Sequence, residues 1–404
     1  MTHDPAAADP AAEELARAVR DHAGRLAGAL VSLLGDFSAA EDLVQDAVET
    51  ALRRWPVEGI PARPDAWLFT VARNRGLDVL RRQENYRSKL ALLQWPVQPE
   101  PDDRLRLIFT CCHPALAREA QIALTLRVVC GLTTGQIAAA FLVPETTLAQ
   151  RITRAKRKIG AAGIPYRVPR EDELGPRLAE VLTVIYLFNE GYLSHAADRI
   201  HSHILVDDAE WLATVLAGEL PNEPEVAGLL ALIRLHRART RARFGPDGRL
   251  VLLQDQDRTQ WDHDAIAGAI GLLTRAARRH HAPGPYQLQA AIAACHSEAR
   301  TWAATDWEQI LVLYDMLITL QPTSITRLHR TVAVRYVHGA EAALIELDHL
   351  AATLDDHALF HATRAELLRA VDRPDEATPA DRRAMDLTSN PGQLAILRSR
   401  LDFD

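Results

Sequence analysis

Residues 131–159 read GLTTGQIAAAFLVPETTLAQRITRAKRKI, and this stretch decides how the front of the chain folds. A short helical pattern over Thr134 to Phe141 is interrupted at Pro144, and a strongly basic helical pattern follows at once. Apolar residues recur in the second pattern at helical spacing and give it a packing face: Leu148, Ile152, Ala155 and Ile159. The stretch therefore predicts a helix-turn-helix, whose second helix lies in the major groove of DNA.

The second helix of this motif concentrates groups that bind DNA. Arg and Gln side chains hydrogen-bond to base edges, and Lys and Arg form ion pairs with phosphates. The helix carries one acid, Glu145, and these candidate DNA-binding residues: Gln150, Arg151, Arg154, Lys156, Arg157 and Lys158. The alternative is a solvated basic helix end, which the agreement of turn, period and charge disfavours.

Composition and charge divide the chain into a front and a back. The 404 residues suffice for two or three domains, and many Ala and Leu with few aromatics favour helices over sheets. The formal net charge of −7 combines +4 over residues 1–170 with −11 over residues 171–404. This asymmetry predicts nucleic acid as a partner of the front, and protein or self-contact for the back. We therefore expect the back to contact the front.

Several motifs are absent from the sequence. No long uninterrupted apolar run predicts a membrane span, and the acidic N-terminus is unlike a secretory signal, so we expect a cytoplasmic protein. Four cysteines in so long a chain indicate a reducing compartment, and Cys111-Cys112-His113 is interpreted as buried thiols rather than a zinc fragment. No Walker A loop, GxGxxG or GxSxG sequence is present, so neither an enzyme nor a cofactor is expected.

Three other clusters have a chemical and a structural interpretation. His201 and His203, with two aspartates after them, form a loose metal-ligating pattern, but residues two apart do not share a helix face. His280-His281 is interpreted as a helix end. Glu190 lies among aromatics, and we expect a capping carboxylate rather than a catalytic acid, because no second carboxylate pairs with it.

Ahead of the helix-turn-helix, the sequence predicts a helix over 11–34 and then two helices joined by a Pro/Gly-rich loop. In the helix over 39–55, Ser38 is the expected N-cap and Glu41 its capping-box partner. One face is acidic, either as a solvated face or as a docking surface. The helix over 66–87 begins apolar and ends basic, as single-stranded nucleic acid requires, although Trp67 is interpreted as a core residue.

Residues 11–160 resemble the extracytoplasmic-function (ECF) group of bacterial RNA polymerase sigma factors. Three segments carry the resemblance, in the order typical of the group: AAEDLVQDAVETALRRW (39–55), PDAWLFTVARNRGLDVLRRQ (64–83) and the helix-turn-helix (131–159). The phrase FTCCHPALA (109–117) and the long helical tail are similar to one subgroup. Its members carry a tetratricopeptide-like C-terminal extension that is implicated in controlling activity.

The resemblance implies a role for each matching position. It implies that the protein contacts the β′ clamp and the β flap of core polymerase. Four residues would face the clamp: Asp42, Gln45, Asp46 and Glu49. Asn74 matches the position that helps hold an extruded −10 base, and Asp78, Arg81 and Arg82 lie on the same helix. Gln150, Arg151 and Arg154 match positions that contact the −35 element. Ala149 stands where many relatives have Arg, so the −35 sequence that is read is expected to differ.

The predicted fold is all-α: two small helical sigma domains followed by a large helical extension. We expect sigma region 2 over 11–93, a linker over 94–103, region 4 over 104–160, a linker over 161–170 and the extension over 171–404. Helical patterns begin 34 residues apart at Asp306, Ala340 and Pro374 and end at Leu320, Leu354 and Leu387, which predicts a tetratricopeptide-like array from about residue 288. Arg243–Asp257 is either a hairpin or a loop.

The leading functional hypothesis is an alternative sigma factor that reads −35 and melts −10 elements, with an extension that regulates activity. Flipping a base costs a few kcal/mol, and stacking returns ~1–3 kcal/mol per base, so melting works by differential binding. The expected partners are core polymerase, promoter DNA, the extension itself and an unknown protein or ligand signal, with no membrane. The alternatives are a helix-turn-helix regulator that does not bind polymerase, and an enzyme fused to a DNA-binding head.

Overall fold

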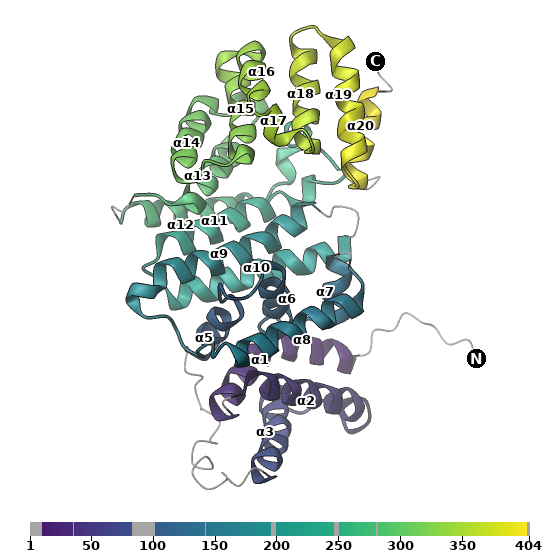
Figure 1. Cartoon of the computed structure of the whole chain (residues 1–404), viewed down its shortest axis with the longest axis vertical. Helices are drawn as coiled ribbons and strands as arrows, with labels where there is room; N and C mark the ends of the chain where they lie inside the picture. The colour runs from purple at the N-terminus through teal and green to yellow at the C-terminus, as the bar shows by residue number, and fades with distance from the viewer. Residues whose placement is uncertain are drawn as a thin grey trace, which may run out of the picture. The chain divides into compact units, whose positions relative to one another are not determined.

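The structure is a computed structural model, and it describes residues 10–34, 36–82, 102–141, 143–194, 199–245, 250–279 and 282–401. Within these ranges the regular elements are helices, as Figure 1 shows. The predicted all-α fold is therefore confirmed. The segment predicted as a hairpin or a loop contains one isolated antiparallel bridge, between Phe244 and Leu250. The chain forms two compact units, residues 1–188 and 189–404.

The first unit opens with three helices: α1 (Pro10–Leu34), α2 (Phe37–Glu58) and α3 (Pro64–Arg82). All three pack on one another around buried Leu30, Leu43 and Leu68, and we call this part domain 2. The N-cap prediction for α2 was wrong. Asp36 Oδ1 accepts the N–H of Ala39 at 3.1 Å, because the helix begins at Phe37, ahead of the expected start. Glu41 therefore does not form the expected capping box with Ser38.

The next four helices form domain 4: α5 (Asp102–Cys111), α6 (Arg118–Val128), α7 (Thr134–Ala140) and α8 (Glu145–Ala161). A reciprocal capping box starts α7, since Thr133 Oγ1 accepts from Gln136 N at 3.1 Å and Gln136 Oε1 accepts from Thr133 N at 2.8 Å. On α8 the four apolar residues predicted to pack are the buried ones: Leu148, Ile152, Ala155 and Ile159. The helix-turn-helix prediction is confirmed in both its helices.

Helix α9 (Glu171–Ser194) crosses the boundary at Phe188 between the two units. The second unit continues with α10 (Arg199–Glu219), α11 (Pro224–Arg237), α12 (His263–Ala277) and α13 (Pro285–Glu298). Helices α11 and α13 approach closely at Gly228, where an added Cβ would lie 2.7 Å from Gln287 N. Only glycine fits this crossing, because a methyl group there would displace backbone.

The chain ends in consecutive antiparallel helices: α14 (Trp307–Leu320), α15 (Ser324–His338), α16 (Ala340–Asp348), α17 (Ala351–Leu354), α18 (Ala358–Ala370), α19 (Pro374–Leu387) and α20 (Pro391–Leu401). The predicted 34-residue pattern of starts is confirmed: Asp306 caps α14, Ala340 begins α16 and Pro374 begins α19. The predicted ends at Leu320, Leu354 and Leu387 are the last residues of α14, α17 and α19.

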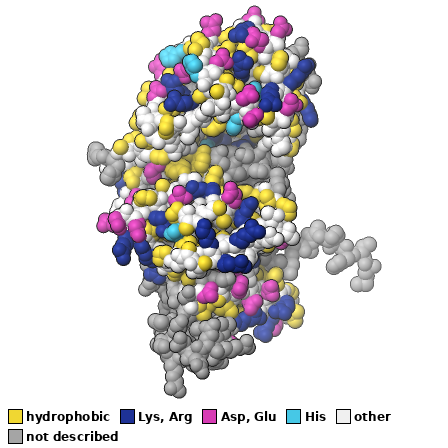
Figure 2. Space-filling view, in the orientation of Figure 1, with side chains coloured by type: hydrophobic (Ala, Val, Ile, Leu, Met, Phe, Trp, Pro, Cys, Tyr) yellow, Lys and Arg dark blue, Asp and Glu magenta, His cyan; other side chains and the backbone are white. Residues whose placement is uncertain are grey.

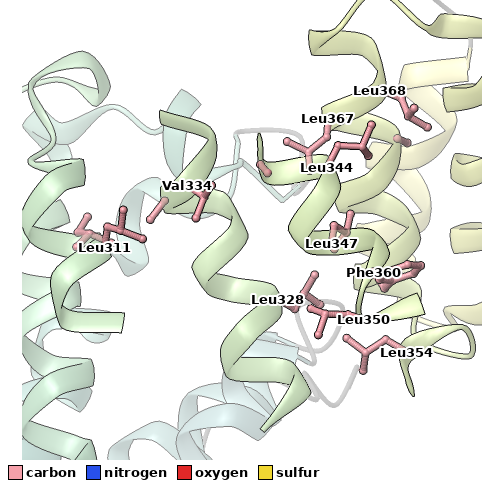
Figure 3. Packing of buried hydrophobic residues seen from close by; sticks show 14 of the residues in the cluster. Leu311, Leu328, Val334, Leu344, Leu347, Leu350, Leu354, Phe360, Leu367 and Leu368 are labelled. Carbon is pink, nitrogen blue, oxygen red and sulfur yellow. The ribbon is translucent and has the colours of Figure 1, made fainter. Parts of the chain in front are cut away.

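The core of these last helices is continuous along the array. Figure 3 shows Leu311 of α14 and Val334 of α15 facing each other, while Leu328 lies beside Leu347 and Leu350. Each helix thus buries side chains against its neighbours in sequence, as stacked helix-pair repeats do. Among the described helices, none is long and apolar enough to cross a bilayer.

Candidate DNA and polymerase interfaces

Helix α8 presents a basic surface opposite its buried face. Four of the predicted DNA-binding side chains are exposed on this surface: Gln150, Arg154, Arg157 and Lys158. A fifth, Arg151, is half-buried. In Figure 2, Lys and Arg side chains gather where α8 lies. Because the apolar residues fix the rotation of α8 in its domain, these groups point outward together and can meet base edges and phosphates.

Lys156 differs from the other basic residues of α8. Its side chain is 13% exposed, and its Nζ pairs with Glu41 Oε2 of α2. The structure therefore turns Lys156 toward domain 2, away from the exposed group predicted to bind DNA. Asp42 Oδ1 lies 4.0 Å from the same nitrogen.

Glu41 is the centre of a second ion pair. Arg127 of α6 approaches its Oε1 at 3.2 Å, and the Arg127 side chain is 16% exposed. Arg127 also donates to the carbonyl of Leu132 at 3.0 Å, which ties it to the turn before α7. Glu41 itself is only 4% exposed. We call Glu41, Arg127 and Lys156 the Glu41 triad; it joins domain 2 to two helices of domain 4.

The sequence could not reveal the Glu41 triad, because its members lie 86 and 115 residues apart and belong to separate predicted domains. Glu41 stands beside the acidic stripe and fits a capping-box spacing, so local pattern assigns it elsewhere. The sequence contained one signal. On a helix with so many Lys and Arg residues, any cation that is buried on folding requires a carboxylate partner.

The acidic stripe of α2 lies next to the triad. Asp42 and Glu49 are exposed, and Asp42 keeps 73% of its side chain in solvent. Asp46 pairs with Arg75 of α3, whose guanidinium also donates to Thr50 Oγ1 at 3.2 Å. The pair links the acidic stripe of α2 to α3, the helix predicted to face the −10 element. Gln45 is half-buried.

Helix α3 presents polar groups after an apolar start. Phe69 is buried, and the half-buried Trp67 meets Trp55 edge-to-face with ring centroids 5.6 Å apart, so the core interpretation of Trp67 is supported. Asn74 and Asp78 are exposed on the outer side. Arg81 and Arg82 are the last helical residues, and their side chains lie outside the described atoms.

A second contact holds domain 4 from α9. Arg177 donates to the carbonyl of Phe109 at 2.6 Å, and Arg118 pairs with Glu180 at 2.8 Å. Along the same helix, one face is buried: Leu178, Val181, Leu182 and Ile185. We call the two polar pairs the α9 anchor. They lie within the first unit and connect the start of the predicted extension to the segment FTCCHPALA.

The CCH segment packs as a structural element. The predicted burial of the cysteines is confirmed, since Cys111 and Cys112 are buried and free. Burial raises the pKa of the Cys112 thiol to about 12 and the pKa of the Cys111 thiol as well. Gln121 Nε2 donates to the carbonyl of His113 at 2.9 Å and fixes the turn after α5.

The remaining sequence candidates give no site within the described atoms. No group of three potential metal ligands occurs among the residues that the structure places. The side chains of His201, His203 and Glu190 lie outside the described residues, as do His280 and His281.

The second unit contains a mainly apolar cavity of about 330 Å³ between α15, α18, α20 and the segment around Leu252. Its polar groups are few. Trp302 Nε1 donates to Tyr336 Oη at 3.1 Å, and Glu366 pairs with Arg335 and Arg400 at one side. Trp307 stacks on Tyr336 with centroids 4.0 Å apart, which holds the ring in place. A mainly apolar cavity of this volume with few polar groups is typical of small-molecule sites.

Family models match three parts of the chain. Residues 18–86 match sigma-70 region 2, and residues 106–159 match sigma-70 region 4. Residues 177–277 match a family of unknown function (DUF6596), which begins at the α9 anchor. The two sigma matches coincide with domain 2 and domain 4.

Two curated relatives are similar to the chain, and the second is a sigma factor. An uncharacterized protein of Rhizobium meliloti (strain 1021) is 42% identical over 393 residues, which cover 93% of this chain and 92% of that protein. The ECF RNA polymerase sigma factor SigL of Mycobacterium tuberculosis is 37% identical over 157 residues, which cover 36% of this chain and 86% of SigL. No solved structure matches the chain.

Proposed function

Because this chain belongs to the ECF sigma factors of bacterial RNA polymerase, we propose that it reads a −35 element with α8 and holds melted −10 bases with α3. A sigma factor binds core RNA polymerase and promoter DNA and is itself a non-enzymatic initiation factor. The observation that carries the proposal is the outward basic surface of α8, which four buried apolar residues hold in place.

The −35 element is read by the exposed residues of α8. Arg154 and Gln150 are exposed, which supports contacts with base edges, since guanidinium pairs with guanine and carboxamide with adenine. Arg157 and Lys158 lie toward the end of the helix and suit phosphates, which fix register without reading sequence. Arg151 is half-buried and supports the same surface.

The −10 element is held by α3. Asn74 is exposed in the middle of the helix and can hydrogen-bond to a base that has left the duplex. Asp78 lies one turn further, and Arg81 and Arg82 would bind the backbone of the separated strand. Melting then needs no bond-making side chain, because trapped single-stranded bases shift the equilibrium away from duplex.

Core polymerase binds to α2. The acidic stripe of Asp42, Gln45, Asp46 and Glu49 is proposed to meet the β′ clamp, and domain 4 the β flap. Asp42 and Glu49 are exposed, which supports this docking. Asp46 is already paired with Arg75, so its contribution is to orient α3 relative to the docked helix.

The helical extension is proposed to regulate these activities. The α9 anchor supports this role, because it connects the start of the extension directly to α5 and α6 of the promoter-reading domain. The cavity beside Tyr336 is a candidate receiver for a small-molecule signal.

Reconstituted transcription tests the proposal. Core polymerase with the full chain should start RNA synthesis at defined sites on a promoter library. Arg154→Ala should weaken −35-dependent promoter binding by about 1–3 kcal/mol, the discrimination of one bidentate base contact. Arg170→Ala is the matched control, since Arg170 is exposed outside α8. Tight duplex binding without any association with core polymerase would instead indicate an ordinary helix-turn-helix regulator.

A further inference from the structure

The cavity beside Tyr336, which we call the Tyr336 cavity, has an apolar body and one charged end. Its volume of about 330 Å³ lies in the range of small-molecule sites. Several elements of the second unit supply its apolar walls, whose main side chains are these: Leu252, Trp302, Val332, Leu359, Ile396 and Leu397. Trp302 Nε1 donates to Tyr336 Oη at 3.1 Å, so the indole requires no polar partner from a ligand. The body of the cavity therefore suits a hydrocarbon group.

The charged end of the Tyr336 cavity has more guanidinium groups than carboxylates. Glu366 pairs with Arg335 through its Oε1. Asp381 is fully buried and pairs with Arg369 at 2.6 Å. Each carboxylate thus has a close guanidinium of its own. Arg400 is the third guanidinium of this cluster and lines the cavity beside Glu366, so one positive charge is in excess at this end.

Arg400 is held by long contacts. Its Nη1 lies 3.5 Å from the carbonyl oxygen of Ala362 and 3.7 Å from Asp381 Oδ1, and its Nη2 lies 3.5 Å from Glu366 Oε2. Hydrogen bonds from N–H to oxygen are usually about 2.7–3.2 Å long, so all three contacts are loose. The Arg400 side chain is nevertheless only 23% exposed. Within the described part of the chain its nearest carboxylate oxygen is 3.5 Å away, so an anionic group in the cavity would be its closest counter-ion.

We propose that the Tyr336 cavity binds a small monocarboxylic acid, with the hydrocarbon body against Trp302 and the apolar walls and the carboxylate on Arg400. Guanidinium and carboxylate match in shape, since two parallel N–H groups meet two oxygens. A cationic ligand is disfavoured, because both oxygens of Glu366 already have guanidinium groups beside them. Binding of such an acid deepens the proposed receiver role of the extension, and only its regulatory consequence rests on that function.

Three probes with the same hydrocarbon chain and different head groups test the charge of the ligand: octanoate, octanol and octylammonium. Each is titrated into the full chain at neutral pH and followed by isothermal titration calorimetry. Octanoate should bind at least about tenfold more tightly than octanol, because its head group makes a hydrogen bond to a charged partner. Octylammonium should bind more weakly than octanol, because Arg400 repels it. Octylammonium binding as tight as that of octanoate, or no octanoate binding at millimolar concentration, would overturn the proposal.

Substitutions on α20 locate the carboxylate of the ligand. Arg400→Gln should lower the affinity for octanoate about tenfold and leave the affinity for octanol unchanged. Arg400→Lys keeps the charge and should retain part of the preference for octanoate. The matched control is Arg398→Gln on the same helix, whose exposed side chain lies outside the cavity lining and whose loss should leave all three affinities unchanged. Equal octanoate affinity in folded Arg400→Gln and in the control would contradict the site.

If Arg400→Gln does not fold, Leu359→Asp tests the same cavity from α18. Leu359 lines the cavity and is 40% exposed, so the substitution should leave folding intact. The new carboxylate repels an anionic head group, so the affinity for octanoate should fall further than the affinity for octanol. Equal losses for the two probes would show that the cavity does not select an anion.

The calorimetric result and the transcription result are independent of each other. A chain that binds octanoate as described but never joins core polymerase would sink the proposed function and leave the site standing. A transcribing chain that binds none of the three probes would sink the site alone.

Discussion

The Glu41 triad and the α9 anchor both hold domain 4, and they use different chemistry. The triad joins it to domain 2 at a carboxylate that two cations share, beside the packing of α1 on α5 and α6 and of α2 on α8. The anchor joins it to α9 through a backbone carbonyl and one surface pair, beside a helix face of buried apolar residues. The two contacts therefore differ in what a substitution removes: a shared, nearly buried charge in the triad, and a charged hydrogen bond in the anchor.

The largest effect should come from removing the packing on which both contacts depend. Leu148 is fully buried on the packing face of α8. Leu148→Ala should destabilise domain 4 by about 2–5 kcal/mol, the usual cost of replacing a buried leucine with alanine. Urea unfolding measures the change, and the triad and the anchor should be lost in the same transition. Thr147→Ala, at the exposed neighbouring position, is the control. A comparable loss in both variants would mean that α8 does not pack as described.

The reactivity of the Cys112 thiol reports whether the α9 anchor is in place. Burial raises the pKa of Cys112 to about 12, so the folded state holds the thiol proton more tightly than the unfolded state does. Its stabilising contribution is therefore complete below the unfolded pKa of about 8.5 and is lost as the pH rises toward 12. At pH 8, the folded chain should be alkylated at Cys112 far more slowly than the unfolded chain, because the thiol is buried and its raised pKa keeps it protonated. Equal rates, measured by mass spectrometry, would show that the anchor leaves Cys112 open.

The hydrogen bond of the anchor should matter more than its ion pair. Arg177→Ala removes a charged donor from the Phe109 carbonyl and should cost about 1.5–3 kcal/mol. The stability of the full chain in urea gives the cost, and faster Cys112 alkylation should accompany it. A neutral result would assign the anchor to its apolar face alone.

The smallest effect is expected at the exposed pair of the anchor. Arg118 and Glu180 keep 35% and 30% of their side chains in solvent, so Glu180→Gln should cost less than about 1 kcal/mol. The loss should shrink further in high salt, because exposed charges are screened. A cost that equals that of Arg177→Ala and resists salt would reverse the ranking of the two pairs.

The sequence predicted what local periodicity controls. The buried face of α8 and the starts of α14, α16 and α19 follow from apolar spacing and capping residues, and the structure has them at the predicted positions. The segments of domains 2 and 4 were also recognisable, because each is a short contiguous motif.

Contacts between distant segments could not be predicted in the same way. Glu41 was assigned to a capping box and Lys156 to DNA, whereas folding brings them together from two domains. Arg177 had no visible partner, because its acceptor is a backbone carbonyl 68 residues away, and every residue has a carbonyl. Long-range pairing depends on how helices cross, and the sequence period does not specify that.

The most direct measurement is transcription reconstituted from core polymerase, the full chain and a promoter library. RNA synthesis should start at defined sites, and Arg154→Ala should weaken −35-dependent promoter binding by about 1–3 kcal/mol because α8 loses a base contact. A chain that never joins core polymerase, or unchanged promoter binding in folded Arg154→Ala, would contradict the account.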